Sequence, residues 1–152
     1  MALYFAYGSN LSREQMRERC PSARPVERAR IPDHRLGFVG HSEAWGGGTS
    51  TIVLAPGETL WGALYEVDDA CLEELGRREG AAYTLSRTPC LTDAGARTIA
   101  HLFVRSRDFD FRPPSDRYVE RIRQGFADWG LDPAALDRAV DRARRADVHS
   151  GS

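Results

Sequence analysis

Lysine is absent from this chain, and all 21 of its basic residues are arginine. The absence excludes three kinds of chemistry: a lysine Schiff base, a P-loop lysine and a lysine general base. Acidic residues number 22, so the formal net charge is -1. That balance excludes a broad positive surface for nucleic acid or for an anionic membrane.

Long hydrophobic runs are missing too, and cysteine is scarce. No segment approaches the roughly 20 apolar residues that span a bilayer, and the start, MALYFAYGSN, lacks the charged and apolar regions of a signal peptide. Cys20, Cys71 and Cys90 form no CxxC pair, so we interpret them as ordinary thiols rather than as a disulfide framework or a zinc site. The four histidines are scattered without metal-binding spacing. These absences predict a cytoplasmic protein.

The length of 152 residues favours one domain, which we place at 1–146, followed by a disordered tail at 147–152. Hydrophobic patterns predict strands at 2–7, 35–40, 50–55 and 60–67, and a hairpin around 93–95. Capping residues predict helices after Ser12, after Asp68 or Asp69, after Ser115 and after Asp132. The pattern is that of an α+β domain whose strand-dense first two-thirds curl into a small barrel.

The turn Tyr7-Gly8-Ser9-Asn10 follows the first predicted strand directly. Gly8 is free to adopt positive φ, and its missing side chain lets a ligand approach the backbone. Backbone N–H groups between a strand and a helix can converge on an anion, with Ser9 and Asn10 adding side-chain donors. The alternative is a plain strand-to-helix connection, because such turns are common. Ser12 and Gln15 then fit a capping box at the start of the next helix.

Glu79 lies at the end of the predicted helix that follows Asp68. A carboxylate is disfavoured there, because the helix dipole is negative at that end. Such a setting raises the pKa of a glutamate towards that of a working base. The alternative is a solvated glutamate paired with the neighbouring Arg77 or Arg78.

Several motifs occur in an order that resembles the γ-glutamylcyclotransferase family. They are Tyr4-Phe5-Ala6-Tyr7-Gly8-Ser9-Asn10-Leu11, the Gly-Gly-x-x-Thr-Ile stretch from Gly47 to Ile52, Leu60-Trp61-Gly62, Glu79-Gly80, and Pro113-Pro114-Ser115 with Tyr118. The resemblance covers roughly residues 3–140. It implies an α+β fold, a small mixed β-barrel of about six strands with flanking helices.

The resemblance also implies a reaction. The α-amine of a γ-glutamyl group attacks its own side-chain carbonyl, giving 5-oxoproline and a free amino acid or amine without a cofactor or metal. By resemblance Glu79 is the general acid/base, and the γ-glutamyl group is bound by Tyr7, Gly8, Ser9, Asn10, Leu11, Gly47 and Phe109. Phe109 stands where the family often has a tyrosine.

The partner implied is a small-molecule γ-glutamyl substrate, with no nucleic acid or membrane, and the chain is expected to be a monomer or homodimer. Two alternatives remain open at this point. One is a non-catalytic binding or regulatory module on the same fold. The other is a cyclotransferase that removes a γ-glutamyl protecting group in secondary metabolism. Glu79 favours an enzyme over a binding module, because a binding module needs no general base at that position.

Overall fold

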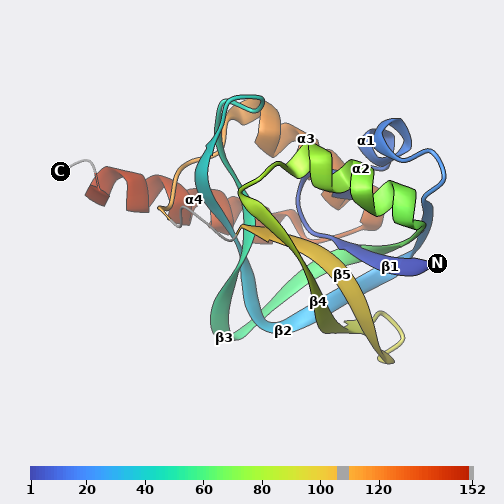
Figure 1. Ribbon diagram of the computed structural model, residues 1–152. Coiled ribbons are helices and arrows are strands. Elements are labelled where there is room, and N and C mark those ends of the chain that lie inside the picture. Colours follow the sequence, from blue (N-terminus) through green and yellow to red (C-terminus); the bar gives the residue numbers. More distant parts are fainter. Residues whose placement is uncertain (106–109, 151–152) are drawn as a thin grey trace.

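Five strands form a closed mixed barrel, with the helices packed around it (Figure 1). The computed structural model describes residues 1–105 and 110–150, with side chains as far as residue 146 in the last helix. The strands are β1 (Ala2–Ala6), β2 (Arg24–Ser42), β3 (Gly47–Val67), β4 (Tyr83–Thr92) and β5 (Arg97–Arg105). Their order is β1-β3-β2-β4-β5, and a parallel pairing of β1 with β5 closes the barrel. The predicted α+β barrel with flanking helices is confirmed.

The strand count is five in the described residues, rather than about six, because two predicted strands are one. The segments 50–55 and 60–67 both belong to β3, which continues through Pro56 and Gly57. The expected turn does not end the strand. It falls where the pairing of β3 with β2 shifts register, between the pairs Pro32–Thr59 and His34–Leu54. Gly57 has a φ of 83°, and its N–H donates to Asp33 Oδ1 at 2.9 Å. Pairing with the long β2 therefore outweighs the local Pro-Gly turn preference.

Four α-helices flank the barrel in the described residues: α1 (Arg13–Arg19), α2 (Asp69–Glu79), α3 (Asp116–Trp129) and α4 (Pro133–Ser150). All four begin as predicted. The side chains of Ser12, Asp68 and Ser115 each accept a hydrogen bond from the backbone N–H three residues on, and α4 starts directly after Asp132, whose side chain accepts from the Ala134 N–H at 3.0 Å. No helix in the described part of the chain is long and apolar enough to cross a membrane.

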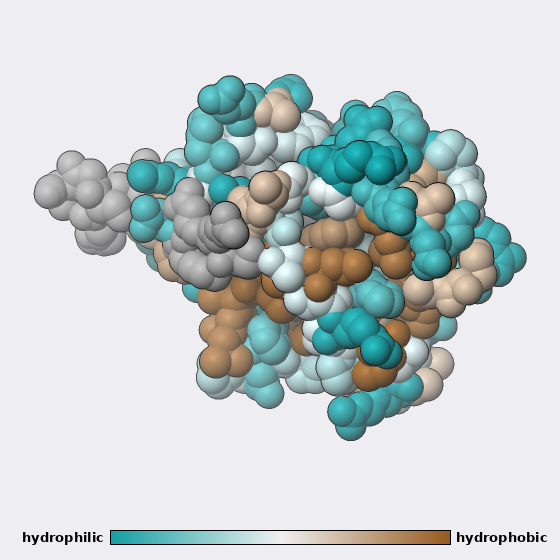
Figure 2. Space-filling model, viewed as in Figure 1, coloured by the Kyte–Doolittle hydropathy of each residue, from teal (hydrophilic) through white to brown (hydrophobic). Residues whose placement is uncertain are grey.

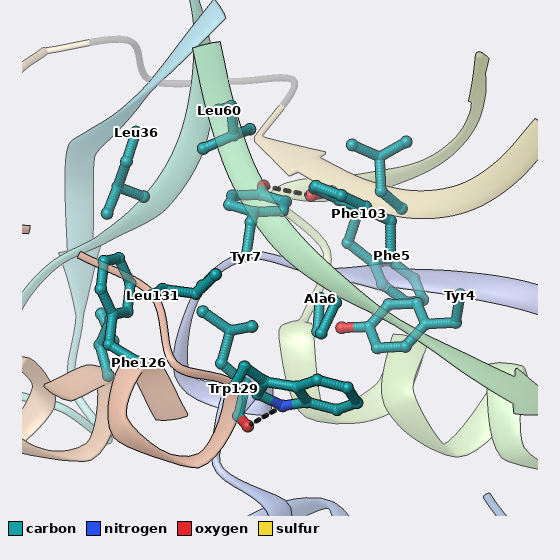
Figure 3. Close-up of a cluster of buried hydrophobic side chains, with 14 of the residues drawn as sticks. Tyr4, Phe5, Ala6, Tyr7, Leu36, Leu60, Phe103, Phe126, Trp129 and Leu131 are labelled. Carbon is teal, nitrogen blue, oxygen red and sulfur yellow. Dashed lines mark hydrogen bonds between the residues drawn. The ribbon is translucent and has the colours of Figure 1, made fainter. Parts of the chain in front are cut away.

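The core fills the barrel and the space beneath α3 and α4. Phe5, Phe38 and Leu64 come from the strands and are almost fully buried. The Trp129 side chain, at the end of α3, donates from Nε1 to the Leu11 carbonyl at 2.9 Å, which fixes the turn after β1 against this helix (Figure 3). On the surface, hydrophobic side chains lie in patches separated by polar ones (Figure 2).

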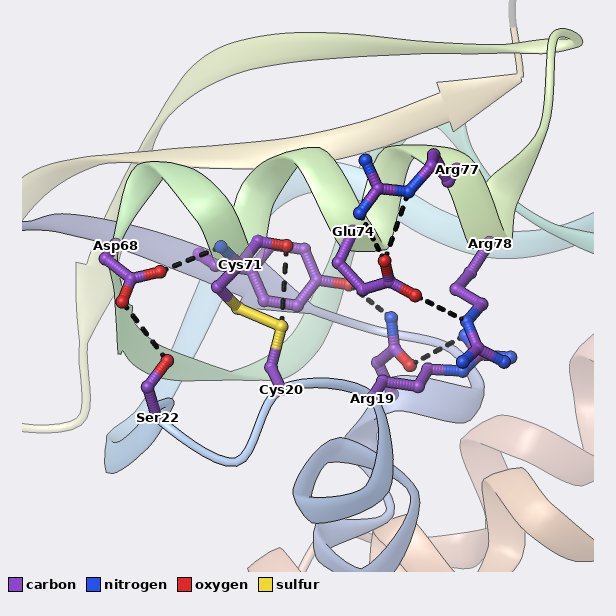
Figure 4. The surroundings of a disulfide bond; sticks show 10 residues. Arg19, Cys20, Ser22, Asp68, Cys71, Glu74, Arg77 and Arg78 are labelled. Carbon is purple, nitrogen blue, oxygen red and sulfur yellow. Dashed lines mark hydrogen bonds and ion pairs between the residues drawn. A yellow bond between two sulfur atoms is a disulfide. The ribbon is translucent and has the colours of Figure 1, made fainter.

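Cys20 and Cys71 form a disulfide between the end of α1 and the first turn of α2 (Figure 4). Their Cα atoms lie 5.5 Å apart, although 51 positions separate them in the sequence. The interpretation of these two residues as ordinary thiols was therefore wrong. Spacing in the sequence carried no sign of the pairing, because packing of α1 beside α2 brings the two residues together. Cys90 is a free, buried cysteine.

Candidate active site

The turn after β1 is buried and held by a network of polar side chains. Gln15 donates from Nε2 to Ser9 Oγ at 2.8 Å and to Asn10 Oδ1 at 2.9 Å. Arg19 donates to the same Asn10 oxygen at 3.0 Å, and Asn10 donates to the Tyr4 hydroxyl at 2.9 Å. Gln15 thus turns towards the ligand-binding candidate residues instead of completing the reciprocal capping box. These bonds fix the Ser9 and Asn10 side chains in the protein's own structure.

The backbone N–H groups of the turn remain available to a ligand. Among the described residues, none accepts a hydrogen bond from the N–H of Gly8, Ser9 or Asn10, whereas those of Leu11 and Ser12 bond to Gly8 and Ser9 carbonyls. Buried backbone N–H groups are otherwise almost always paired. Three consecutive donors of this kind form a concavity suited to an anion or a developing oxyanion.

Gly8 is required for a different reason from the one predicted. Its φ is -119°, so the turn makes no use of positive φ. A Cβ at this position would instead lie 2.2 Å from Ser50 Oγ, on the neighbouring strand β3. Ser50 is itself fixed by Tyr118, whose hydroxyl accepts from the Ser50 N–H at 3.0 Å and contacts Ser50 Oγ at 2.9 Å. Glycine therefore allows the turn to approach β3.

Glu79 is the last residue of α2, and Gly80, with φ of 89°, ends the helix there. Its carboxyl is partly buried and lines a narrow pocket together with residues 7–10 of the turn. Burial raises the pKa of Glu79 from 4.5 to about 7, and the positive charge of Arg19 acts in the opposite direction. Arg77 and Arg78 both pair with Glu74. The alternative of a solvated Glu79 paired with a neighbouring arginine is therefore wrong.

Tyr83 completes the pocket, and nothing in the sequence marked it as a site residue. Its hydroxyl lies 2.6 Å from the Ser50 carbonyl, to which it donates, and 2.7 Å from the Thr49 hydroxyl. Burial, with a contribution from the charge of Glu79, raises the pKa of Tyr83 to about 12, so the phenol stays protonated. Tyr7 also lines the pocket and donates to the Phe103 carbonyl (Figure 3). Tyr83 follows the end of α2 closely, with its N–H donating to the Gly80 carbonyl at 3.2 Å, but the contact of its hydroxyl with Thr49 and Ser50 joins segments more than 30 residues apart, which a local motif does not reveal.

Glu79 lines two separate spaces. The inner pocket, formed by residues 7–10 with Tyr4, Ser50, Glu79, Tyr83 and Phe103, measures about 10 Å³. It has room for about one water-sized group, such as an oxygen of a carboxylate or carbonyl. The outer cavity measures about 300 Å³ and shares Ser9, Glu79 and Tyr83 with the inner pocket. Glu79 therefore borders both the small inner pocket and the larger outer cavity.

The other predicted binding residues take varied positions. Leu11 is fully buried beneath α3, where its backbone carbonyl accepts from Trp129. Gly47 lies against the loop before α3, since a Cβ there would be 2.9 Å from the Pro113 carbonyl oxygen. Neither residue lines the two spaces at Glu79. Phe109 lies outside the described residues. No group of three or more potential metal ligands occurs in the described part of the chain.

Comparison with known proteins agrees with this geometry. The family model described as "Gamma-glutamyl cyclotransferase, AIG2-like" matches residues 4–126. The chain belongs to this family. It is 32% identical over 136 residues to the human protein named gamma-glutamylcyclotransferase, covering 85% of this chain and 72% of the human one. The bovine protein of the same name is 33% identical over the same shares.

Solved structures extend the likeness to the whole fold. A structure titled "Gamma-glutamyl cyclotransferase" superposes with a TM-score of 0.83 at 30% identity, covering 91% of this chain and 85% of that one. YkqA from Bacillus subtilis superposes with a TM-score of 0.73 at 21% identity, covering 94% of this chain and 54% of YkqA. At that identity the second match shows the fold alone. The family membership expected from the ordered motifs is confirmed.

Proposed function

We propose that this member of the γ-glutamyl cyclotransferase family is itself a γ-glutamylcyclotransferase. One observation carries the proposal: the partly buried carboxyl of Glu79, with a pKa of about 7, lines the same pocket as the turn whose Gly8, Ser9 and Asn10 N–H groups have no acceptor among the described residues. A proton acceptor and an anion-binding group in one pocket are what cyclisation of a γ-glutamyl group needs. The names of the relatives support the same activity.

In the proposed reaction, Glu79 in its ionised form takes a proton from the α-ammonium of the γ-glutamyl group. The free amine attacks the γ-carbonyl carbon and forms the new carbon–nitrogen bond of a five-membered lactam. Negative charge on the carbonyl oxygen is stabilised by backbone N–H groups of the turn. Glu79 then gives its proton to the leaving nitrogen as the old carbon–nitrogen bond breaks, and the carboxylate takes up the second proton of the ring nitrogen, which passes on to the released amine or to water. The products are 5-oxoproline and a free amine or amino acid.

Position matters in this reaction as much as proton transfer does. The γ-glutamyl chain must fold back on itself so that its own nitrogen reaches its side-chain carbonyl. The walls formed by Tyr4, Tyr7 and Tyr83 are held by hydrogen bonds to other groups of the protein, so the pocket is already shaped before substrate enters. A rigid, partly dehydrated pocket favours this folded geometry.

Production of 5-oxoproline from a panel of γ-glutamyl dipeptides and γ-glutamyl amines tests the proposal. Because Glu79 moves the proton, Glu79→Gln should lower kcat by about 10²-fold or more. Glu73→Gln makes the same change at an exposed position of α2 and should leave kcat unchanged. Two results would contradict the proposal: a wild-type protein that binds one of these γ-glutamyl compounds but forms no 5-oxoproline, or a Glu79→Gln variant with full activity. The first result would favour the non-catalytic binding module.

Three further expectations from the sequence accompany this proposal. They are a small-molecule partner rather than nucleic acid or membrane, a monomeric or homodimeric state, and a cytoplasmic location. Residues Leu11, Gly47 and Phe109 also remain predicted substrate contacts.

A further inference from the structure

Gln15 is a buried residue of α1 that lines neither the inner pocket nor the outer cavity. Its Nε2 group donates to Ser9 Oγ at 2.8 Å and to Asn10 Oδ1 at 2.9 Å. Both acceptors belong to the turn after β1, and both residues line the inner pocket together with Glu79. One amide group of α1 therefore occupies the acceptor oxygens of two successive residues of the turn.

The start of α1 does not need the Gln15 side chain. Ser12 Oγ accepts from the Gln15 backbone N–H at 3.3 Å and so caps the helix. In a capping box the Gln15 side chain would accept from the Ser12 N–H, but that N–H donates to the Ser9 carbonyl at 3.0 Å instead. Because backbone groups already complete this end of the helix, the amide of Gln15 is free to bind the turn.

The side chains of the turn are possible partners for its own N–H groups. Serine and asparagine in turns commonly fold back and accept hydrogen bonds from their own or neighbouring backbone N–H groups. Here the N–H groups of Gly8, Ser9 and Asn10 have no acceptor among the described residues, although two such oxygens lie in the same turn. An unpaired buried N–H is costly, so a free side-chain oxygen would be expected to pair with one of them.

We propose that Gln15 is a positioning residue that keeps the anion-binding N–H groups of the turn open. This inference rests on the proposed function and names the group that prepares the turn for the substrate's carbonyl oxygen. By donating to Ser9 Oγ and Asn10 Oδ1, Gln15 holds both oxygens away from the backbone. Arg19 donates to the same Asn10 oxygen at 3.0 Å, whereas no second side chain in the described part of the chain donates to Ser9 Oγ. The position of the Ser9 side chain therefore depends on Gln15.

Gln15→Met tests this role, because methionine keeps the length of the side chain and removes both donors. Ser9 Oγ then becomes free to accept from an N–H of the turn, which takes that donor from the developing oxyanion. For γ-glutamyl-alanine, kcat should fall by about tenfold or more with a smaller change in KM, because this interaction strengthens in the transition state. Gln124→Met makes the same change at an exposed position of α3 and should leave both constants unchanged.

A second substitution separates this role from a structural one. Ser9→Ala removes the oxygen that folds back, so adding it to Gln15→Met should restore part of the lost kcat. A residue that only supports packing predicts the opposite, since a second lost polar contact cannot repair the first. A double variant that is no more active than Gln15→Met alone would therefore overturn the inference.

Amide hydrogen exchange, followed by nuclear magnetic resonance, provides a readout that does not depend on turnover. In the wild-type protein the N–H groups of residues 8–10 should exchange faster than those of Leu11 and Ser12, which have backbone acceptors. At least one of the three should become more protected in Gln15→Met and lose this protection in the double variant. Equal exchange in the wild type and a folded Gln15→Met variant would overturn the inference and leave the proposed function intact. A wild-type protein that forms no 5-oxoproline from any γ-glutamyl compound would overturn the proposed function, while the exchange rates would still decide whether Gln15 keeps the turn open.

Discussion

Glu79 combines two properties that are costly for a folded protein. It ends a helix, where the dipole disfavours a negative charge, and it is buried enough for its pKa to rise to about 7. Arg77 and Arg78, the basic side chains next to it on α2, form ion pairs with Glu74 instead. The positive charge of Arg19 opposes the shift. A carboxyl in this position is half-ionised near neutral pH, which suits transfer of a proton in both directions.

The raised pKa of Glu79 has a consequence for stability. Between pH 4.5 and about 7 the folded protein binds a proton at Glu79 that the unfolded chain has lost, so the free energy of unfolding falls as pH rises through this window. Glu79→Gln removes the titration. At pH 8 the variant should be more stable than wild type by up to about 3 kcal/mol, from roughly 1.4 kcal/mol per pKa unit.

Urea unfolding of both proteins between pH 4 and pH 8 measures this difference. The gain in Glu79→Gln should shrink as pH falls and vanish near pH 4, where Glu79 is protonated in both states. Glu73→Gln, at an exposed position of α2, should show no gain at pH 8. A constant difference across the pH range would mean that the effect comes from packing and not from ionisation.

At the scale of elements, α1 and α2 act as a pair. α1 carries Gln15 and Arg19, which hold the turn after β1, and α2 carries Glu79. The disulfide between Cys20 and Cys71 joins the end of α1 to the start of α2. The distance between the turn after β1 and the Glu79 carboxyl therefore depends on the packing and the disulfide that join these two short helices.

Loss of this disulfide should destabilise the protein. It closes a loop of 51 positions, for which the loop-entropy model gives a loss of up to about 4 kcal/mol on reduction. Dithiothreitol should therefore lower the urea midpoint of the wild-type chain. The double variant Cys20→Ser/Cys71→Ser should start at the lower midpoint and show no response to dithiothreitol. An identical midpoint for wild type with and without reductant would show that the bond contributes nothing to stability.

For the whole molecule, features that depend on neighbouring residues were predicted correctly from the sequence, whereas contacts between segments distant in the sequence were not. Ser12, Asp68 and Ser115 were identified as helix caps, because a cap depends only on the three residues that follow it. The place of Glu79 at a helix end made it a candidate, and the resemblance to the family assigned it the role of general acid/base. Tyr83 and the bond between Cys20 and Cys71 were not predicted, since each depends on segments that are distant in the sequence: the Tyr83 hydroxyl contacts Thr49 and Ser50 of β3, and the disulfide forms where α1 packs beside α2. The prediction that a turn at Pro56-Gly57 separates two strands was wrong for the same reason, because β3 pairs with the distant β2 on both sides of these residues.

The last helix tests whether the chain is one cooperative unit. Leu136 of α4 is fully buried, and α4 packs against β2. Leu136→Ala should therefore lower the free energy of unfolding by about 2–5 kcal/mol, because it leaves a cavity in the shared core. Far-ultraviolet circular dichroism and tryptophan fluorescence, which includes Trp45 on the β2–β3 connection and Trp129 on α3, should report one shifted transition.

The neighbouring exposed residue provides the control for this experiment. Asp137 pairs with Arg123 at the surface, with its side chain 58% exposed, so Asp137→Ala should change stability by less than about 1 kcal/mol. Separate transitions in Leu136→Ala, with helical signal lost before fluorescence changes, would mean that α4 is a unit apart from the barrel. A single transition would instead place Leu136 in the same cooperative core as Leu11. Because Leu11 ends the turn beneath α3, stability gained in α4 would then also hold the N–H groups of Gly8, Ser9 and Asn10 in place.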